Sequence, residues 1–501
     1  MIKVQLYVPP GGYFAERWAK GSSMPPLGLL SIAAVLDREG IAVEVVPADV
    51  LEMSWRDIRR KIEADRPDVI GVTITTENRF QSFRLIRLAK KVHPAGLTVL
   101  GGPHASMAGE DCLEHIPELD VVVRGEGELT MLDLCRAWET EKSVAALGTI
   151  PGLVLRTASG IRCGPIRPPI EDLDGLPFPA FHLVPFEKYN FRFPVPGLGP
   201  LPAASLMTSR GCPFACSFCA TPINWGRRVR MRSPENVVDE IEFLKKRYGV
   251  RIVFFYDDTF NASPKRAEAI VDLMIERRLD VFFKCDVRID IMSRELLEKM
   301  KRAGLFHLSF GLEAGSERVR NEIVGKKIEI GDFHNLVRWC LELGIIPNVF
   351  FIFSHPTETW SEAGETIRII ESYRGRIEGS IALLHIYPGT PLEQLARETG
   401  VLPRNFSWTK RYFSKIITLP LAQGDVPLYV DRLKWSQISE LVLRWSLAAQ
   451  RTSVLAKIPK AVSKIRSFGD LKRDLIMGGV YVRLKAGAFF RSGRSRTSSE
   501  S

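Results

Sequence analysis

Three cysteines stand close together in the segment Ser209–Cys219, which reads Ser-Arg-Gly-Cys-Pro-Phe-Ala-Cys-Ser-Phe-Cys. The glycine and proline beside the first cysteine indicate a turn, so one loop presents the thiols of Cys212, Cys216 and Cys219. Iron–sulfur clusters are usually held by four thiolates, and a cluster held by three leaves one iron open to another ligand. Zinc would need a fourth cysteine or histidine nearby, and the neighbouring sequence has none. The spacing therefore favours iron–sulfur chemistry over a zinc site or incidental loop cysteines.

The same segment resembles the signature of the radical S-adenosylmethionine (SAM) family, CxxxCxxC with an aromatic residue before the last cysteine. Phe218 stands at that aromatic position. The resemblance implies a [4Fe-4S] cluster on Cys212, Cys216 and Cys219, with SAM bound to the open iron. It also implies that one electron cleaves SAM to a 5′-deoxyadenosyl radical, which takes a hydrogen atom from the substrate.

Later segments resemble further motifs of the cobalamin-binding branch of this family. The resemblance implies that Glu313, Ser316 and, with them, Asp257 orient SAM. The segments that carry it are Phe254–Phe260, Phe310–Ser316 and Tyr387–Leu392.

The fifth-strand motif of the family is usually Gly-Leu-Pro-Gly-Glu-Thr, and this chain departs from it. Its segment Phe353–Thr359 reads Phe-Ser-His-Pro-Thr-Glu-Thr, so Ser354 and Thr357 replace the glycines. Any close backbone approach that needs those glycines is therefore in question. His355 is either a substrate-facing group or an ordinary capped loop histidine.

Strand and helix patterns alternate from residue 203 to about residue 395. Six β/α units predict a partial barrel, whose active site lies at the carboxyl ends of its strands. Fewer units than a closed barrel leave a lateral opening, which suits a bulky substrate. The predicted strands are 204–208, 251–256, 281–286, 307–311, 346–353 and 381–386, and the predicted helices are 234–248, 265–277, 294–303, 332–343 and 361–373.

The first 140 residues show a second alternation of strands and helices, with a helix predicted at 27–38, and this alternation is typical of a doubly wound (Rossmann-like) parallel sheet. The pattern contains no GxGxxG after the first strand and no P-loop. Ligands of such sheets lie at the carboxyl ends of the strands. The residues expected there, as the lining of a cofactor crevice, are Thr73, Gly101, Gly102, His104, Gly125 and Glu126.

Three segments of this region resemble the cobalamin-binding domain that precedes the barrel in one class of radical SAM proteins. They are Met24–Leu30, Gly101–Ser106 and Val123–Glu128. The Asp-x-His-x-x-Gly string of histidine-ligated cobalamin proteins is absent. The resemblance thus implies bound cobalamin without a histidine on its lower face, and the alternative is a domain that binds nothing.

The 501 residues, with 45% hydrophobic and 25% charged residues, have an ordinary globular composition. The fold class expected is α/β: a cobalamin-binding domain (1–142), a Pro/Gly-rich irregular linker (143–202), a partial (β/α)6 radical SAM barrel (203–395) and a basic, mostly helical C-terminal extension (396–501). The first residues read as a strand and no apolar run is long enough to span a membrane, so a cytoplasmic protein is expected.

The net charge of +11 is concentrated at the end of the chain, because residues 434–501 hold 14 Lys and Arg against 4 Asp and Glu. Amphipathic helices are predicted at 435–447, 454–465 and 471–490. They form either a solvated cap on the barrel or a surface that touches anionic lipid at the inner face of the membrane. No RNA-binding module is recognised, so nucleic acid is not an expected partner.

Together these features predict a cobalamin-dependent radical SAM enzyme that methylates an unactivated carbon through methylcobalamin. One alternative keeps the cofactors but performs oxidative ring closure, as in the anaerobic magnesium-protoporphyrin monomethyl ester cyclases. The other is a non-catalytic cobalamin sensor or carrier. The expected substrate is a small molecule, with lipids (as for hopanoid methylases) and tetrapyrroles as candidates, and the expected electron donor is a flavodoxin or ferredoxin.

Overall fold

The computed structural model describes residues 2–10, 24–158, 160–412 and 426–449. The chain forms two compact units, and each is described by itself. The first unit contains Met1–His307 and His385–Leu428, and the second contains Leu308–Leu384 and Tyr429–Ser501.

The first unit begins with a parallel sheet of five strands. Their apolar residues are buried on both faces, as expected for a doubly wound sheet. The spatial order β2-β1-β3-β4-β5 places the first strand inside the sheet, which confirms the predicted topology. The strands are β1 (Lys3–Val8), β2 (Ala42–Pro47), β3 (Val69–Thr73), β4 (Leu97–Gly101) and β5 (Val121–Val123).

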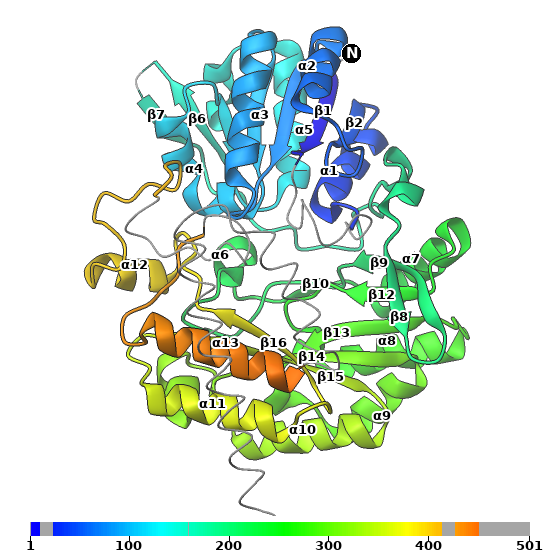
Figure 1. The fold of residues 1–501 in the computed structure, drawn as a ribbon. Helices are drawn as coiled ribbons and strands as arrows, with labels where there is room; N and C mark the ends of the chain where they lie inside the picture. Colours follow the sequence, from blue (N-terminus) through cyan, green and yellow to red (C-terminus); the bar gives the residue numbers. More distant parts are fainter. Residues whose placement is uncertain (1, 11–23, 159, 413–425, 450–501) are drawn as a thin grey trace, which may run out of the picture. The chain divides into compact units, whose positions relative to one another are not determined.

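Helices cover both faces of this sheet (Figure 1). Helices α2 (Trp55–Asp65), α3 (Arg79–Val92) and α4 (Pro103–His115) share one apolar core with the strands. Helices α1 (Leu27–Arg38) and α5 (Gly127–Thr140) pack against each other. The predicted helix at 27–38 matches α1, because its periodic apolar residues are those that become buried.

Residues 143–202 are not an irregular linker as predicted. Strands β6 (Leu153–Thr157) and β7 (Gly160–Cys163) extend the first sheet with antiparallel pairing. Strands β8 (Arg192–Val195) and β9 (Gly199–Leu206) form an antiparallel hairpin. The many prolines suggested a loop, but β8 is an edge strand, where proline is tolerated.

The barrel portion of the first unit follows the predicted alternation. Parallel pairing joins β9 to β12 (Ile252–Phe255) and β12 to β13 (Phe282–Val287). A serine hydroxyl caps the first turn of each of the three helices that follow these strands. Those helices are α7 (Pro234–Tyr248), α8 (Pro264–Glu276) and α9 (Arg294–Arg302), and α12 (Pro391–Glu398) also belongs to this unit.

The second unit continues the strand–helix alternation. Strand β14 (Leu305–Glu313) runs into it, and β15 (Ile346–Phe353) pairs in parallel with β16 (Glu378–Leu383). Its helices are α10 (Ile330–Glu342), α11 (Trp360–Ser372) and α13 (Trp435–Ala449).

Helix α13 confirms the first of the three predicted C-terminal helices. It lies beside α11 (Figure 1), where Arg444 pairs with Glu371 at 2.7 Å. The indole of Trp445 donates to the Gly379 carbonyl at 2.7 Å. This helix therefore caps the second unit. The helices predicted at 454–465 and 471–490 lie outside the described residues.

Candidate active site

The three cysteines lie on an excursion from a short two-stranded ribbon, here called the cysteine ribbon. Its strands are β10 (Ser209–Arg210) and β11 (Arg230–Met231), which pair antiparallel. Gly211, where the chain leaves β10, has a φ of +102°, and a Cβ there would lie 2.5 Å from the Arg228 carbonyl oxygen. Only glycine fits this exit, so the sequence forces a sharp turn just before the first cysteine. Helix α6 (Thr221–Trp225) follows the last cysteine.

All three cysteines are half-buried and outside any disulfide, whereas four of the other five cysteines are buried. The Thr221 amide donates to Cys219 Sγ at 3.4 Å, and Cys212 Sγ lies 3.5 Å from Thr259 Oγ1. Burial raises the pKa of the Cys219 thiol, and the Thr221 hydrogen bond opposes that rise. The thiols are thus accessible to a metal centre and already have polar partners.

The donor set fits an iron–sulfur cluster better than zinc. Zinc binds sulfur at about 2.3 Å, so the thiolates of a zinc site lie within about 4 Å of one another. In the described part of the chain, three side chains of the types that bind metal ions have their ligand atoms within 4.8 Å of one another. They are Asp111, Glu114 and His115, on α4. Cys212, Cys216 and Cys219 are not such a group, and an all-thiolate set of ligands is typical of iron–sulfur clusters.

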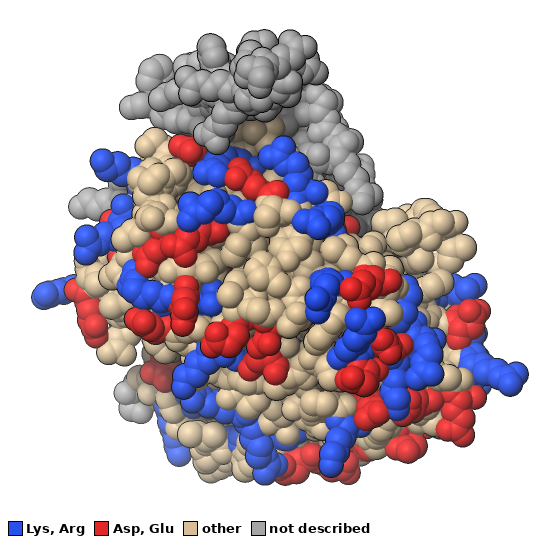
Figure 2. All heavy atoms as spheres, turned by 90° about the horizontal axis from the view of Figure 1, so that it is seen from below, with Lys and Arg blue, Asp and Glu red and all other residues tan. Residues whose placement is uncertain are grey.

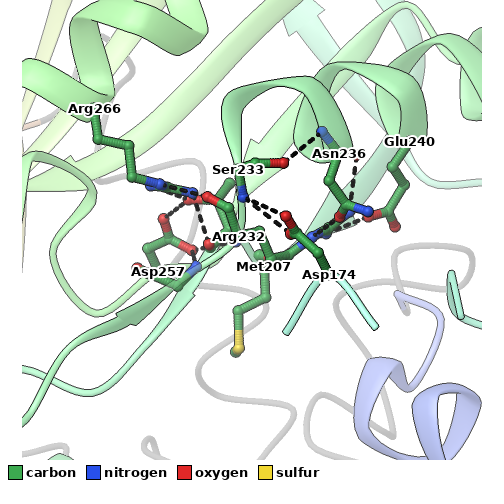
Figure 3. Close-up of polar contacts among 10 residues, drawn as sticks. Asp174, Met207, Arg232, Ser233, Asn236, Glu240, Asp257 and Arg266 are labelled. Atoms are coloured by element: carbon green, nitrogen blue, oxygen red, sulfur yellow. Dashed lines mark hydrogen bonds and ion pairs between the residues drawn. The ribbon is translucent and has the colours of Figure 1, made fainter. Parts of the chain in front are cut away.

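The base of the cysteine ribbon is held by buried charges of the barrel portion (Figure 3). Asp257 Oδ1 accepts from the amides of Thr208 and Ser209 at 2.6 and 3.0 Å. Arg266 donates to the Thr208 carbonyl at 2.7 Å and to the Arg232 carbonyl at 2.7 Å. Burial raises the pKa of Asp257, and these hydrogen bonds lower it. The predicted SAM-orienting residue Asp257 is therefore engaged with the chain segment that leads into the cysteines.

Arg232 supplies the second half of this support. Its guanidinium donates to the Met207 carbonyl at 3.0 Å and to Asn236 Oδ1 at 2.6 Å, and it pairs with Glu240. In Figure 3, the backbone amide of Ser233 faces Asp174, whose carboxylate accepts from it at 3.0 Å. Sequence reasoning missed this network, because its members are ordinary polar residues on separate elements.

Asp258 differs from its neighbour because its side chain is exposed. Its Oδ1 accepts from Thr221 Oγ1 at 2.9 Å, next to the last cysteine. Partial desolvation raises its pKa to about 6, the Thr221 hydrogen bond opposes that, and the charges of Asp257 and Asp286 add to it. A carboxylate with a raised pKa thus lies at the cysteine loop.

The residues predicted to line the cobalamin crevice follow or end the strands of the first sheet. Gly102 has a φ of +112°, and a Cβ there would lie 2.8 Å from the Ile74 carbonyl oxygen. Gly125 also has a left-handed backbone, with open space around it. Thr73 and Gly101, paired across β3 and β4, lie half-buried at the same edge. Thr73, Gly101, Gly102 and Gly125 therefore place small side chains at this edge of the sheet.

The other two predicted crevice residues are turned inward. His104 is completely buried, its Nδ1 lies 3.0 Å from Thr76 Oγ1, and its ring packs between Phe83 and Trp408. Burial lowers its pKa to about 3, and the positive charge of Arg79 contributes. The ring is therefore neutral and lies behind the crevice surface.

Glu126 is directed at the cysteine ribbon. Its carboxylate accepts from the Ile170 amide at 2.8 Å and pairs with Arg230. It thus joins the crevice loop to the ribbon within the first unit.

The remaining predicted SAM residues lie in the second unit. Glu313 has a φ of +66°, a left-handed backbone that a residue with a side chain seldom adopts. Its carboxylate is nearly buried and lies 2.7 Å from Lys326 Nζ. Ser316 is buried, with its hydroxyl 3.4 Å from Glu362 Oε1. Backbone strain of this kind is typical of functional sites.

The loop after β15 keeps a left-handed backbone at the two positions where the family usually has glycine. Ser354 and Thr357 have φ values of +70° and +61°, both in the left-handed region. Glu358 holds the loop, because its Oε2 accepts from the amides of Ser354 and His355 at 2.6 and 3.0 Å. His355 is buried, and burial lowers its pKa to about 4. Replacement of the glycines therefore leaves the loop geometry intact at the cost of strain.

Comparisons with known proteins identify the family of the chain. Residues 206–370 match the family model of the radical SAM superfamily, and residues 20–134 match that of the B12 binding domain. An uncharacterized methyltransferase of Pyrococcus horikoshii is 31% identical over 413 residues, which cover 82% of this chain and 86% of that protein. An anaerobic magnesium-protoporphyrin IX monomethyl ester cyclase of Rubrivivax gelatinosus is 30% identical over 84% of this chain and 74% of its own length.

A solved structure shares the fold. The radical SAM methyltransferase TsrM of Kitasatospora setae, determined with cobalamin and a [4Fe-4S] cluster, superposes with a TM-score of 0.70 at 20% identity, covering 96% of this chain and 99% of that chain. The predicted α/β class, with a Rossmann-like domain followed by a partial barrel, is thereby confirmed. The chain belongs to the radical SAM superfamily and is an enzyme of its branch with an N-terminal B12-binding domain.

Proposed function

We propose that this enzyme uses a [4Fe-4S] cluster, SAM and cobalamin to methylate an unactivated carbon of a small molecule. The observation that carries the proposal is the loop of three half-buried cysteines, which emerges from a ribbon attached to the B12-binding domain within one unit. The cysteine ribbon would thus carry a cluster with one open iron and also contact the loop that lines the cobalamin crevice.

The roles of the residues follow from their placement. Cys212, Cys216 and Cys219 hold the cluster, and Phe218 lies beside the last of them in the same loop. Asp257 acts on the cluster indirectly, through the Thr208 and Ser209 amides that it fixes.

In the second unit, Glu313 and Ser316 are our candidates for binding the polar groups of SAM. The Glu313 carboxylate pairs with Lys326, and a carboxylate is a suitable acceptor for the ammonium and hydroxyl groups of that ligand. The left-handed backbone at Glu313 holds the side chain in one orientation.

The strand ends of the first sheet would receive the cobalamin. Thr73, Gly101, Gly102 and Gly125 offer small groups and backbone atoms at the crevice. His104 supports the loop from behind, and Glu126 ties it to the ribbon. When the groups are bound, the cluster supplies the electron that cleaves SAM and the cobalamin supplies the methyl group that replaces the abstracted hydrogen.

Oxidative cyclisation is the second candidate, favoured by the 30% identity to a protein named as a cyclase. Both reactions begin with hydrogen abstraction, so the site residues above serve either. Incubation with methyl-labelled SAM separates the two, because label enters the product only in a methylation.

Anaerobic reconstitution with iron, sulfide and cobalamin tests the shared part of the proposal. We expect about four irons per chain, bound cobalamin and reductant-dependent formation of 5′-deoxyadenosine from SAM. A Cys216→Ala protein should keep cobalamin and lose the cleavage of SAM. Zinc in the cysteine loop, or full biological activity of that variant, would contradict an enzyme of this class.

The substrate class and the partners are also proposals. A lipid or tetrapyrrole substrate, a flavodoxin or ferredoxin as electron donor and contact with anionic lipid through the basic C-terminal residues are consistent with the sequence. In the described residues, no helix combines the length and apolarity that crossing a membrane requires. On the face in Figure 2, basic residues are interspersed with acidic ones, so the described surface there carries no large field of one sign.

A further inference from the structure

We propose that two glutamates of the B12-binding domain and two arginines of the cysteine ribbon form a clamp that sets the position of the cluster loop against the cobalamin crevice. The clamp consists of Glu126, Glu128, Arg210 and Arg230. The inference rests on the proposed function, because the position of one cofactor site against the other matters only if the two work together.

Ion pairs and hydrogen bonds join the two sides directly. Arg210 Nη2 donates to Glu128 Oε1 at 2.6 Å, and its Nη1 lies 3.5 Å from Glu126 Oε2. Arg230 pairs with Glu126 Oε1 and donates to the Ile170 carbonyl at 2.6 Å. Both arginines belong to the ribbon, and both glutamates belong to the start of α5 or the residue before it.

The clamp is buried and balanced in charge. The side chains of Arg210 and Glu128 are 10% and 6% exposed, and those of Arg230 and Glu126 are 3% and 6% exposed. Its two arginines and two glutamates leave the clamp without a net charge. Buried pairs of this kind are directional, because any displacement leaves a charged group without water or a partner.

The ribbon needs such a clamp, because each of its strands has only two residues. Two-stranded ribbons are marginally stable by themselves. Asp257 and Arg266 hold its base to the barrel portion, and the glutamates hold it to the B12-binding domain. Arg210 also lies over the Trp225 ring at 5.2 Å, so the clamp touches the helix that follows the cysteines. A misplacement of about 1 Å between reacting groups can cost about a hundredfold in rate.

The test uses the double variant Arg210→Met/Glu128→Gln. It removes one acid and one base, so Glu126 and Arg230 remain as a balanced pair. Either single variant leaves the buried group with an unbalanced charge. We therefore expect the double variant to melt above both single variants. If it melts below both, the two residues are not a pair and the clamp is refuted.

A matched control comes from the B12-binding domain itself. Lys90 and Asp120 pair at 2.6 Å between α3 and the residue before β5 and do not touch the ribbon. The variant Lys90→Met/Asp120→Asn removes an ion pair of the same length without touching the clamp.

The first readout is amide hydrogen exchange of the reconstituted full chain. Loss of the clamp should speed exchange at least about tenfold in residues 209–231, and the control variant should leave that segment unchanged. A merely stabilising role would speed exchange across the whole domain in both variants. Unchanged exchange in the ribbon of the clamp variant would overturn the inference whatever the reaction catalysed.

The second readout counts two products of SAM in the presence of titanium(III) citrate. 5′-Deoxyadenosine reports reductive cleavage, with methionine as the other product, and S-adenosylhomocysteine reports methyl transfer to the reduced cobalt. In the clamp variant we expect deoxyadenosine within about twofold of wild type and at least a tenfold lower rate of S-adenosylhomocysteine formation. Equal rates in variant and wild type would refute the clamp. If the wild type forms neither product, the proposed function fails, and hydrogen exchange alone then decides the clamp.

Discussion

Two glutamates of the β15–α11 region have opposite electrostatic environments. Glu358 is completely buried, and desolvation raises its pKa to about 7, against hydrogen bonds from His355 and Ser354 that lower it. Glu362 pairs with Arg318 at 2.7 Å, and this partner lowers its pKa to about 2. At neutral pH, a fraction of the folded protein therefore carries a proton on Glu358 and a negative charge on Glu362.

This difference predicts a pH effect on stability. Between pH 4.5, the ordinary pKa of a glutamate, and pH 7, the folded chain holds a proton on Glu358 that the unfolded chain has released. Stability from this group must therefore fall as the pH rises through that window, by at most about 3 kcal/mol. Glu358→Gln should remove the fall, so its melting temperature should exceed that of wild type more at pH 8 than at pH 5.

Glu362→Gln is the matched control with the opposite sign. Its folded pKa lies below the ordinary value, so the stability it contributes is present at neutral pH and is lost as the pH falls below about 4.5. The variant should therefore melt below wild type at pH 8 and approach it in acid. If the two variants change with pH in the same direction, the assigned environments are wrong.

At the scale of elements, the cysteine ribbon depends on one glycine. Gly211→Ala would place a Cβ 2.5 Å from the Arg228 carbonyl oxygen at a φ of +102°. We expect a loss of about 2–4 kcal/mol of stability and less than half of the wild-type iron after reconstitution. Iron content and the midpoint of thermal unfolding measure the two effects.

Gly249→Ala is the control for that prediction. Gly249 ends α7 with a φ of +65°, and nothing lies within 4 Å of the added Cβ. It should cost about 1–2 kcal/mol from the left-handed backbone alone and leave iron content unchanged. Equal iron loss in both variants would mean that general instability, not the ribbon turn, governs cluster assembly.

At the scale of the whole molecule, most of the excess positive charge can be removed by truncation without removing a described element. Helix α13 belongs to the packed second unit, whereas residues 450–501 hold most of the basic excess. Removing 450–501 should leave cluster and cobalamin binding intact. It should abolish co-sedimentation with vesicles that contain anionic lipid, because each basic group near such a surface contributes about 1 kcal/mol.

Two further measurements complete this experiment. Removal of 434–501 should in addition lower the melting temperature, since it deletes the Arg444–Glu371 pair and the Trp445 contact. Binding of the 1–449 protein to anionic vesicles as strong as that of the full chain would discard the membrane proposal. Equal binding of the full chain to neutral vesicles would discard it as well.

Local patterns in the sequence predicted most of the elements. The helices predicted at 27–38 and 234–248 match α1 and α7. For α7, the apolar periodicity lies between Ser233 and Gly249, which mark the two ends of the helix. Strand β8 was missed, because its proline carries a loop signal that an edge strand tolerates.

The sequence by itself determined the chemistry of the cysteine loop, because its three thiols, its turn glycine and its aromatic residue are contiguous. Only the tertiary structure decided what Asp257, His104 and Glu126 contact. The partners of such groups are far away in the chain: Arg210 and Glu128 are 82 residues apart, and Asp257 reaches back 49 residues to Thr208. Spacing along the chain encodes which donors share a loop, whereas the pairing of buried charges depends on which surfaces folding brings together.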